Sequence, residues 1–209
     1  MSLTILVTGF GPFPGAPFNP TGLLAQRIAR ARRPALADVK LVAHIFPTSY
    51  AAVDRELPAL IAKHNPDALL MFGLAPRARA FRVETRARNV LALLPDVGGA
   101  SLGRRTIAVG GPASIKLRTP SRPQLAALRG LQPRATLSRD AGRYLCNYLC
   151  WRAAETASSG NKPRLASFIH VPPVRRGPRR TRDNTLVSLN DLTDAGTRAL
   201  VALVAAARR

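Results

Sequence analysis

The sequence predicts a single α/β domain spanning residues 1–209, with a mostly parallel, twisted central sheet. Two observations lead to this prediction. Short runs rich in β-branched and other apolar residues alternate with amphipathic stretches of helical period, which is the pattern of βαβ units. The chain is also long enough to bury roughly 70% of the surface that it exposes when unfolded, so it needs neither a metal nor a disulfide for stability.

The first third of the chain contains three expected strands and two expected helices. The strands are short and apolar, and are expected at Ser2–Thr8, Val39–Phe46 and Ala68–Phe72. Helices are expected over Pro20–Arg33, with Asn19 as N-cap, and over Tyr50–Lys63. The inner face of the first helix is expected to consist of Leu23, Leu24, Ile28 and Ala31.

The remainder of the chain continues the alternation after a less regular middle part. Phe81–Val90 alternates like an extended strand, and Pro95–Thr119, rich in Gly and Pro, is expected to form a protruding hairpin and loops. Further helices are expected at Ser121–Leu128, at Arg143–Thr156 and from Asn190, the last with Leu192, Leu200 and Leu203 inward. Strands are expected at Arg134–Ser138 and from Leu165 to His170, where two prolines end the ladder. An Arg-rich loop, Arg175–Arg182, precedes the last helix.

The net charge of +21 is carried almost entirely by arginine, because only four of the 32 Lys and Arg residues are lysines. Such a charge suggests nucleic acid as a partner, but the arginines are spread over the whole chain, aromatic residues make up only 5%, and no nucleic-acid-binding motif accompanies them. We therefore expect no specific nucleic-acid binding. Non-specific affinity for polyanions would follow from the charge alone.

The number and spacing of the cysteines are typical of a protein in a reducing compartment. Cys146 and Cys150 lie one helical turn apart, and no Cys and His cluster has zinc spacing, so neither a disulfide nor a metal site is expected. The N-terminus has no basic leader, and no apolar run approaches the ~20 residues of a membrane span. We therefore expect a cytoplasmic protein without a membrane partner.

Cys146 is a candidate nucleophile because it falls in the first turn of a helix that follows Gly142. The helix dipole and the unpaired N–H groups at that place favour an anion, and hence a thiolate. The alternative is that Cys146 is a small buried hydrophobic residue in an apolar stripe, which position alone favours. For Cys150, one turn deeper, we expect the buried role.

The search for a base is short, because the chain has only three histidines. His170 stands at the end of a strand and is expected to face the crevice at the carboxyl edge of the sheet. His64 is expected to cap a helix, and His44 to pack within a strand or to hydrogen-bond at an edge. Glu84, the lone acid among four arginines, is either a solvated salt-bridge partner or a carboxylate that orients a histidine.

The loop after the first strand contains three phenylalanines, Phe10, Phe13 and Phe18, in a rigid Pro/Gly context where open α/β sheets bind ligands. A dinucleotide fingerprint is the rival interpretation of Gly9-Phe10-Gly11. Its third glycine is out of place, and three prolines stiffen a turn whose N–H groups would have to bind phosphate. We therefore expect no nucleotide site.

Four separated stretches together resemble the pyroglutamyl peptidase I family, also called pyrrolidone-carboxylate peptidase. The resemblance spans residues 3 to about 173. It is carried by an N-terminal signature, a glutamate motif, a cysteine motif and a histidine motif. These are Leu6-Val7-Thr8-Gly9-Phe10 with Pro12-Phe13 and Asn19-Pro20-Thr21; Gly73-Leu74-Ala75 with Val83-Glu84, Ala87 and Asn89; Ala141-Gly142, Tyr144 and Cys146-Asn147; and Phe168-Ile169-His170-Val171-Pro172.

This resemblance implies a three-layer α/β/α fold and a hydrolase that removes N-terminal pyroglutamate from peptides without a cofactor. It implies that Cys146 is the nucleophile, His170 the base and then the acid, and Glu84 the orienting carboxylate. Phe10 and Phe13 would flank the pyrrolidone ring, with Asn19 and Leu74 as further substrate contacts. It also implies a homo-oligomer, a tetramer or a dimer.

The chain departs from the family pattern in several places. Thr85 stands where the family usually has Arg, the family's paired glycines are replaced around Pro76-Arg77, and Pro173 replaces an aromatic position. Leu93–Arg118 matches poorly, apart from Pro95-Asp96 and the nearby glycines. A catalytically silent or substrate-altered relative that acts as a binding protein is therefore the alternative.

Overall fold

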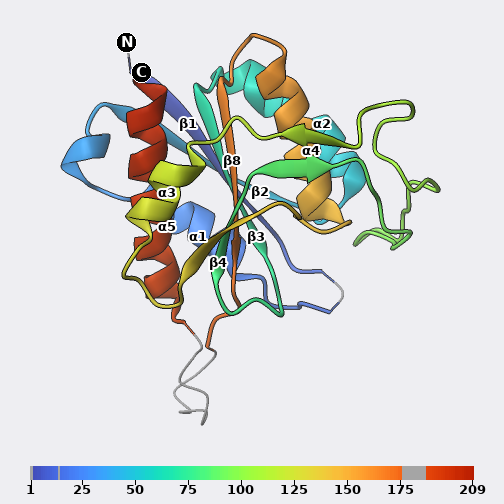
Figure 1. Ribbon diagram of the computed structural model, residues 1–209, viewed down its shortest axis with the longest axis horizontal. Helices are drawn as coiled ribbons and strands as arrows, with labels where there is room; N and C mark the ends of the chain where they lie inside the picture. The colour runs from blue at the N-terminus through green and yellow to red at the C-terminus, as the bar shows by residue number, and fades with distance from the viewer. Residues whose placement is uncertain (1, 14, 176–186) are drawn as a thin grey trace.

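A six-stranded sheet runs through the centre of the molecule in the computed structural model, which describes residues 2–13, 15–175 and 187–209 (Figure 1). Its strand order is β2-β1-β3-β8-β4-β7. The strands are β1 (Leu3–Phe10), β2 (Val39–Phe46), β3 (Ala68–Leu74), β4 (Phe81–Glu84), β7 (Ala135–Ser138) and β8 (Leu165–Val171). All neighbouring pairs are parallel except β4 and β8. The expected mostly parallel sheet is thus confirmed.

Helices cover both faces of this sheet, so the expected three-layer arrangement is confirmed (Figure 1). One face carries α1 (Pro20–Ala29), α3 (Ser121–Ala127) and α5 (Leu189–Ala207), and the other carries α2 (Tyr50–His64) and α4 (Leu145–Ser158). A short 3₁₀ helix, η1 (Pro34–Leu36), links α1 to β2. The alternation of side chains along β1 explains the layers: Ile5 and Val7 pack on the α1 and α5 side, and Leu6 packs on the α2 side.

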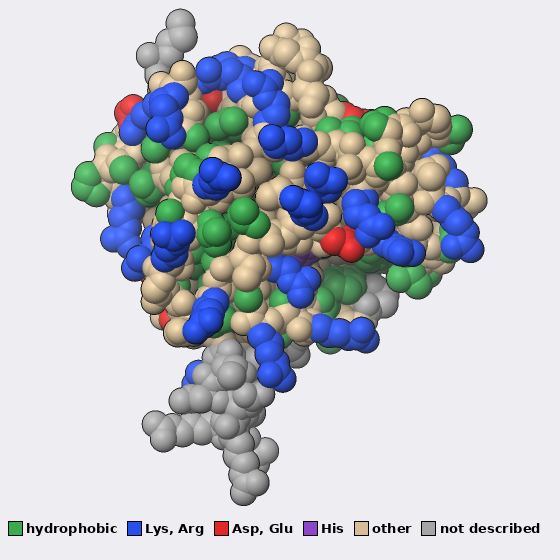
Figure 2. Space-filling model, viewed as in Figure 1, with side chains coloured by type: hydrophobic (Ala, Val, Ile, Leu, Met, Phe, Trp, Pro, Cys, Tyr) green, Lys and Arg blue, Asp and Glu red, His purple; other side chains and the backbone are tan. Residues whose placement is uncertain are grey.

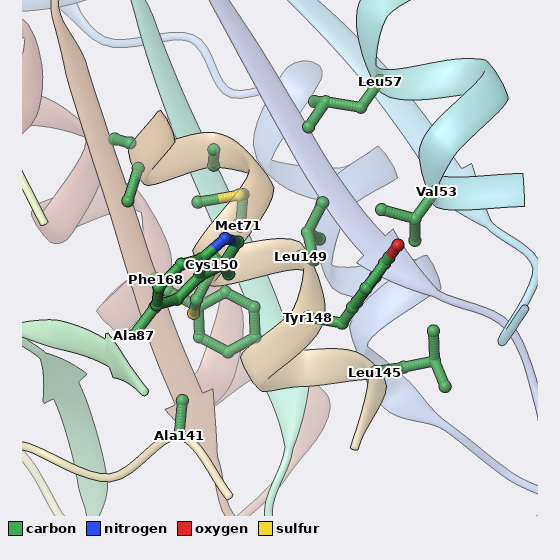
Figure 3. Close-up of a cluster of buried hydrophobic side chains, with 14 of the residues drawn as sticks. Val53, Leu57, Met71, Ala87, Ala141, Leu145, Tyr148, Leu149, Cys150 and Phe168 are labelled. Carbon is green, nitrogen blue, oxygen red and sulfur yellow. The ribbon is translucent and has the colours of Figure 1, made fainter. Parts of the chain in front are cut away.

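The core on the α2 and α4 side surrounds the cysteine helix (Figure 3). Cys150, Tyr148 and Leu149 of α4 pack against Met71 of β3 and Phe168 of β8, and all five are fully buried. This burial holds α4 along the sheet, with its N-terminus at the carboxyl edge of β3 and β8. Cys150 is therefore a packing residue, as expected.

The prediction of one continuous strand over Phe81–Val90 is wrong. It divides at Thr85 into β4, in the central sheet, and β5 (Arg86–Arg88), which pairs with β6 (Ser114–Lys116) in a separate antiparallel pair. Thr85 is the branch point, because its N–H and hydroxyl both donate to Ser138 O while its carbonyl accepts from Leu117 N. The segment between β5 and β6 projects beyond α2 and α4, which confirms the expected protrusion, but residues 89–113 are loops and the hairpin pairing is limited to β5 and β6 at its base (Figure 1).

The first helix is shorter than expected, and one of its expected core residues is wrong. It ends at Ala29, because Arg30 turns its N–H back to Arg27 O and Pro34 then begins η1. Leu23 is 44% exposed, whereas Leu24 and Ile28 are fully buried as expected. The buried face of α1 is thus narrower than the positions of its apolar residues predict.

The last helix begins at Leu189 behind a capping box formed by Ser188 and Asp191. Its expected inner residues, Leu192, Leu200 and Leu203, are all fully buried. Within the described residues, no helix combines the length and apolarity needed to span a bilayer. The expected Arg-rich loop over Arg175–Arg182 lies, beyond Arg175, outside the described residues.

Candidate active site

A cavity of ≈ 580 Å³ opens at the carboxyl edge of the parallel strands. Its lining crosses the sheet from Phe10, at the end of β1, past Leu74 and His170, at the ends of β3 and β8, to Thr136 on β7. Cys146 lines the same cavity. This is the position at which open α/β sheets bind ligands.

Cys146 is the second residue of α4, so it lies within the first turn as predicted. The chain reaches α4 through a turn in which Gly142, at φ 87°, donates its N–H to Asp140 Oδ1 at 3.0 Å. The N-cap is Tyr144, and no side chain among the described residues caps the first-turn N–H groups. These donors and the positive end of the dipole are available to an anion in the cavity.

His170 and Glu84 meet across the antiparallel β4 and β8 pair. His170 Nδ1 lies 2.8 Å from Glu84 Oε1, and their side chains are only 7% and 0% exposed. Burial by itself would lower the pKa of His170. The charge of the Cys146 sulfur and its hydrogen bond, followed by the hydrogen bond and charge of Glu84, outweigh burial and raise this pKa from 6.5 to about 9. The imidazole is therefore protonated near neutral pH, with Nδ1 held by Glu84 and its other nitrogen left for Cys146.

Gly73 provides the space that the Cys146 sulfur occupies. It pairs in register with His170 across β3 and β8. A Cβ at this position would lie 2.7 Å from Cys146 Sγ and 2.6 Å from Phe168 Cζ, closer than real Cβ contacts come. In the sequence Gly73 stands out only as part of a motif. The need for a residue without a side chain arises because β3, β8 and α4 meet at this position in the folded chain.

The other histidines and the second cysteine have structural surroundings. Burial raises the pKa of Cys150 well above its usual value. His44, on the edge strand β2, lies 2.9 Å from Glu56 Oε2 and is thus the expected edge hydrogen bonder. His64 is the last residue of α2, but the cap itself is Asn65 in the left-handed conformation, so the expected capping role of His64 is wrong.

The four residues expected to contact the substrate all line the cavity, but their side chains differ in how much surface they expose to it. Phe13 is partly exposed, and its ring lies 6.5 Å from that of Tyr144. Leu74 is 8% exposed. Phe10 is only 2% exposed and packs against Phe46, so it forms a wall more than a free contact.

The Asn19 side chain already has partners within its own loop. Its Oδ1 accepts from Thr21 N at 3.1 Å and from the Thr21 hydroxyl at 2.8 Å, and its Nδ2 donates to Gly11 O at 3.0 Å. These bonds shape the loop that carries the phenylalanines and confirm Asn19 as the N-cap of α1.

Two polar residues whose roles were not predicted hold the site together. Asn147 accepts from Arg88 N at 2.9 Å and donates to the carbonyls of Arg88 and Val90, which fixes the start of α4 to β5. Asp96 accepts from Tyr50 N and from two loop N–H groups, while Tyr144 donates to the carbonyl of the preceding Pro95. The projecting segment thus anchors the cysteine turn through Pro95 and Asp96, which are among its few residues that match the family pattern.

The described residues contain no group of three or more His, Cys, Asp or Glu side chains that could hold a metal ion. Cys146 and Cys150 are both free thiols. The chemistry that the cavity supports is nucleophilic attack by sulfur, assisted by an oriented imidazole and by the N–H groups of a helix N-terminus.

Comparisons with known proteins agree with this site. A family described as pyroglutamyl peptidase matches residues 3–207. The chain is 30% identical over 210 residues to a pyrrolidone-carboxylate peptidase of Bacillus subtilis, which covers 100% of this chain and 94% of that protein. It is 29% identical over 171 residues to one of Pyrococcus furiosus, with 81% of each covered.

Solved structures give the same result. A pyrrolidone carboxyl peptidase from Thermococcus litoralis superposes with a TM-score of 0.85 at 27% identity, covering 97% of this chain and 94% of that chain. Pyroglutamyl peptidase I from Bacillus amyloliquefaciens superposes with a TM-score of 0.82 at 26% identity, covering 97% of each chain. The fold, the position of the cysteine helix and the sequence match together show that this chain belongs to the pyroglutamyl peptidase family.

Proposed function

We propose that this protein is a cysteine peptidase that removes pyroglutamate (5-oxoproline) from the N-terminus of peptides, with Cys146, His170 and Glu84 as its catalytic group. One observation carries the proposal. A thiol in the uncapped first turn of α4 faces a buried imidazole that is hydrogen-bonded through Nδ1 to a fully buried carboxylate. Nucleophilic catalysis by a thiolate requires this constellation.

Acylation uses the charge separation between Cys146 and His170. The thiolate attacks the carbonyl carbon of pyroglutamate, and the carbonyl π electrons move to oxygen, where first-turn N–H groups of α4 stabilise the oxyanion. As the carbonyl re-forms, the C–N bond breaks and the leaving nitrogen takes a proton from His170. The products of this step are a thioester on Cys146 and the shortened peptide with a free amine.

Deacylation returns the enzyme to its starting state. The now neutral His170 accepts a proton from water, whose oxygen attacks the thioester carbon. Collapse of the second tetrahedral intermediate expels the Cys146 thiolate and releases pyroglutamic acid, with His170 again protonated. Glu84 keeps Nδ1–H bound throughout, so the same nitrogen of His170 serves as acid and base.

The cavity walls support selection of a small, uncharged ring. Phe13, Phe10 and Leu74 form an apolar side at the β1 end of the cavity. A lactam ring fits apolar walls, whereas an ordinary N-terminal ammonium group would lose its hydration against them. Phe13 is the more exposed of the two phenylalanines, so it is the one available to contact the pyrrolidone ring of the substrate.

The direct test is hydrolysis of a fluorogenic pyroglutamyl amide by the wild type and by Cys146→Ser, His170→Ala and the double variant. Each single variant should lose at least about a hundredfold in kcat/KM, and the double variant should lose no more than about as much as the worse single one, since members of one catalytic group do not act additively. Cys150→Ala, in the same helix but fully buried, is the matched control and should retain activity. A folded wild type that does not turn over would identify a silent binding relative.

We also propose a homo-oligomer in a reducing, cytoplasmic setting. The nucleophile must remain a free thiol, as both cysteines are in this structure. The projecting segment exposes four large apolar side chains, with Leu93 at 50%, Leu94 at 56%, Val97 at 50% and Val109 at 83%. Self-association would cover such side chains. Light scattering on the purified protein measures the mass, and a monomer at micromolar concentration would exclude the oligomer.

A further inference from the structure

Arg82 lies beside the candidate base His170, on the strand farther from the apolar end of the cavity that Phe10 and Phe13 form. It pairs in register with His170 on one side and with Thr136 on the other. It alternates with Val83, so it points to the same face as Glu84, and it is exposed where Glu84 is buried. A cationic side chain therefore lines the cavity next to the reacting group.

The strand order fixes which part of a substrate Arg82 would meet. The apolar walls belong to β1 and β3, the catalytic histidine to β8, and Arg82 to β4, in this spatial order across the sheet. If the pyroglutamyl ring occupies the apolar end, the peptide beyond the scissile bond must leave across β4 and β7. The inference rests on the proposed function for this direction.

The same route continues into a second hollow. A cavity of ≈ 840 Å³ shares Arg82 and Thr136 with the first and is also lined by Arg79, Arg134 and Arg175. Arg79, Arg82 and Arg134 are exposed, and none of them forms a salt bridge with a described carboxylate. Figure 2 shows basic side chains over this whole face, with few acidic ones among them.

The acidic residues near this route already have partners. Asp140 accepts from Arg88 at 2.9 Å, and Asp194 accepts from Arg198 at 3.0 Å. Asp191 caps α5 through Ser188. Asp191 and Asp194 line the second hollow themselves, with Asp194 paired to Arg198 and Asp191 held at the N-terminus of α5. Arg79, Arg82 and Arg134 have no salt bridge to a described carboxylate, so their charge is available to a ligand.

We propose that Arg82, with Arg79 and Arg134 beyond it, forms a basic subsite that makes the enzyme prefer pyroglutamyl peptides with acidic side chains in the positions that follow pyroglutamate. Arg82 would bind the first carboxylate after the scissile bond, and the outer arginines would bind later ones. Guanidinium groups suit carboxylates because their N–H donors match both oxygens. These contacts lie at an exposed rim, so each contributes modestly and is weakened by salt.

The test compares three pyroglutamyl peptides of equal length, in which the two residues after pyroglutamate are Asp-Glu, Asn-Gln or Lys-Lys. At low ionic strength kcat/KM should follow the order acidic, neutral, basic, with the acidic peptide roughly three- to tenfold above the neutral one. This ratio should approach one at about 0.5 M salt. Arg82→Gln should reduce the ratio at least about twofold relative to Arg122→Gln. Arg122 is the matched control, because it is exposed on α3, lines neither cavity and has no ion pair to a described residue.

A second readout does not depend on turnover. The same peptides, added to the His170→Ala variant, which keeps Cys146 but should hydrolyse them very slowly, should protect Cys146 from iodoacetamide. The acidic peptide should do so at a concentration roughly three- to tenfold lower than the neutral one. Hydrolysis of all three peptides at similar rates would overturn the basic subsite and leave the proposed function intact. Absence of hydrolysis, together with preferential protection by the acidic peptide, would overturn the proposed function and leave the subsite standing.

Discussion

Replacing Glu84 by Gln removes a charge from the site and leaves its shape nearly unchanged. Glu84 is fully buried, its Oε1 accepts from His170 Nδ1 at 2.8 Å, and its Oε2 has no hydrogen-bond partner among the described residues. The glutamine oxygen can still accept from Nδ1–H. The substitution therefore tests the charge of Glu84, which favours the imidazolium form of His170.

The magnitude follows from the raised pKa of His170. The rise from 6.5 to about 9 corresponds to roughly 3 kcal/mol in favour of the imidazolium, at about 1.4 kcal/mol for each pH unit. Cys146 contributes more of the rise than Glu84 does. Loss of the Glu84 charge should then lower the pKa of His170 by about one pH unit. Most of the imidazole stays protonated near neutral pH, so kcat/KM should fall only partly there and about tenfold above pH 9.

The pH dependence has a definite sign. The folded-state pKa is raised, so the imidazolium is present below about pH 9 and is lost as the pH rises through that value. The profile of kcat/KM for a pyroglutamyl amide should fall on its alkaline side near pH 9, and in Glu84→Gln this limb should move to lower pH. Glu56→Gln is the matched control, because Glu56 bonds His44 at 2.9 Å outside the site. An alkaline limb at the same pH in Glu84→Gln and wild type would refute this account of His170.

Other perturbations test the remaining parts of the site. Iodoacetamide should label Cys146 at least about tenfold faster than Cys150 near neutral pH, because Cys150 is fully buried and its pKa is raised; mass spectrometry of tryptic peptides measures the two rates, and equal rates would contradict the assignment. Gly73→Ala should slow labelling of Cys146 and destabilise the fold by about 1–3 kcal/mol, because the new methyl group overlaps the sulfur; unchanged labelling and melting would show that the site can relax. Phe13→Ala should raise KM for a pyroglutamyl amide about tenfold and leave labelling of Cys146 unchanged, and a normal KM would place ring recognition elsewhere.

Much of the architecture was predictable from local patterns. Among the described residues, the apolar runs and helical periods predicted each strand of the central sheet and each α-helix. The errors lie at element ends, such as α1 ending at Ala29 instead of Arg33, and in the continuity of Phe81–Val90. His170 was expected at a strand end because Pro172 and Pro173 cannot continue a ladder, and β8 ends at Val171. Cys146 was expected in the first turn of a helix because Gly142 breaks the chain before it. Each of these features depends on a few neighbouring residues, so it can be predicted from the local sequence.

The tertiary structure alone decided which groups meet. Glu84 had two open interpretations, and only the antiparallel pairing of β4 with β8 brings its carboxylate to His170, 86 residues away. The same pairing places Arg82 beside His170, and the packing of α4 on β3 makes Gly73 indispensable to the Cys146 sulfur. Strand order and register follow from the burial of the whole core, to which every element contributes, and for that reason no single stretch of this sequence encodes the assembled site.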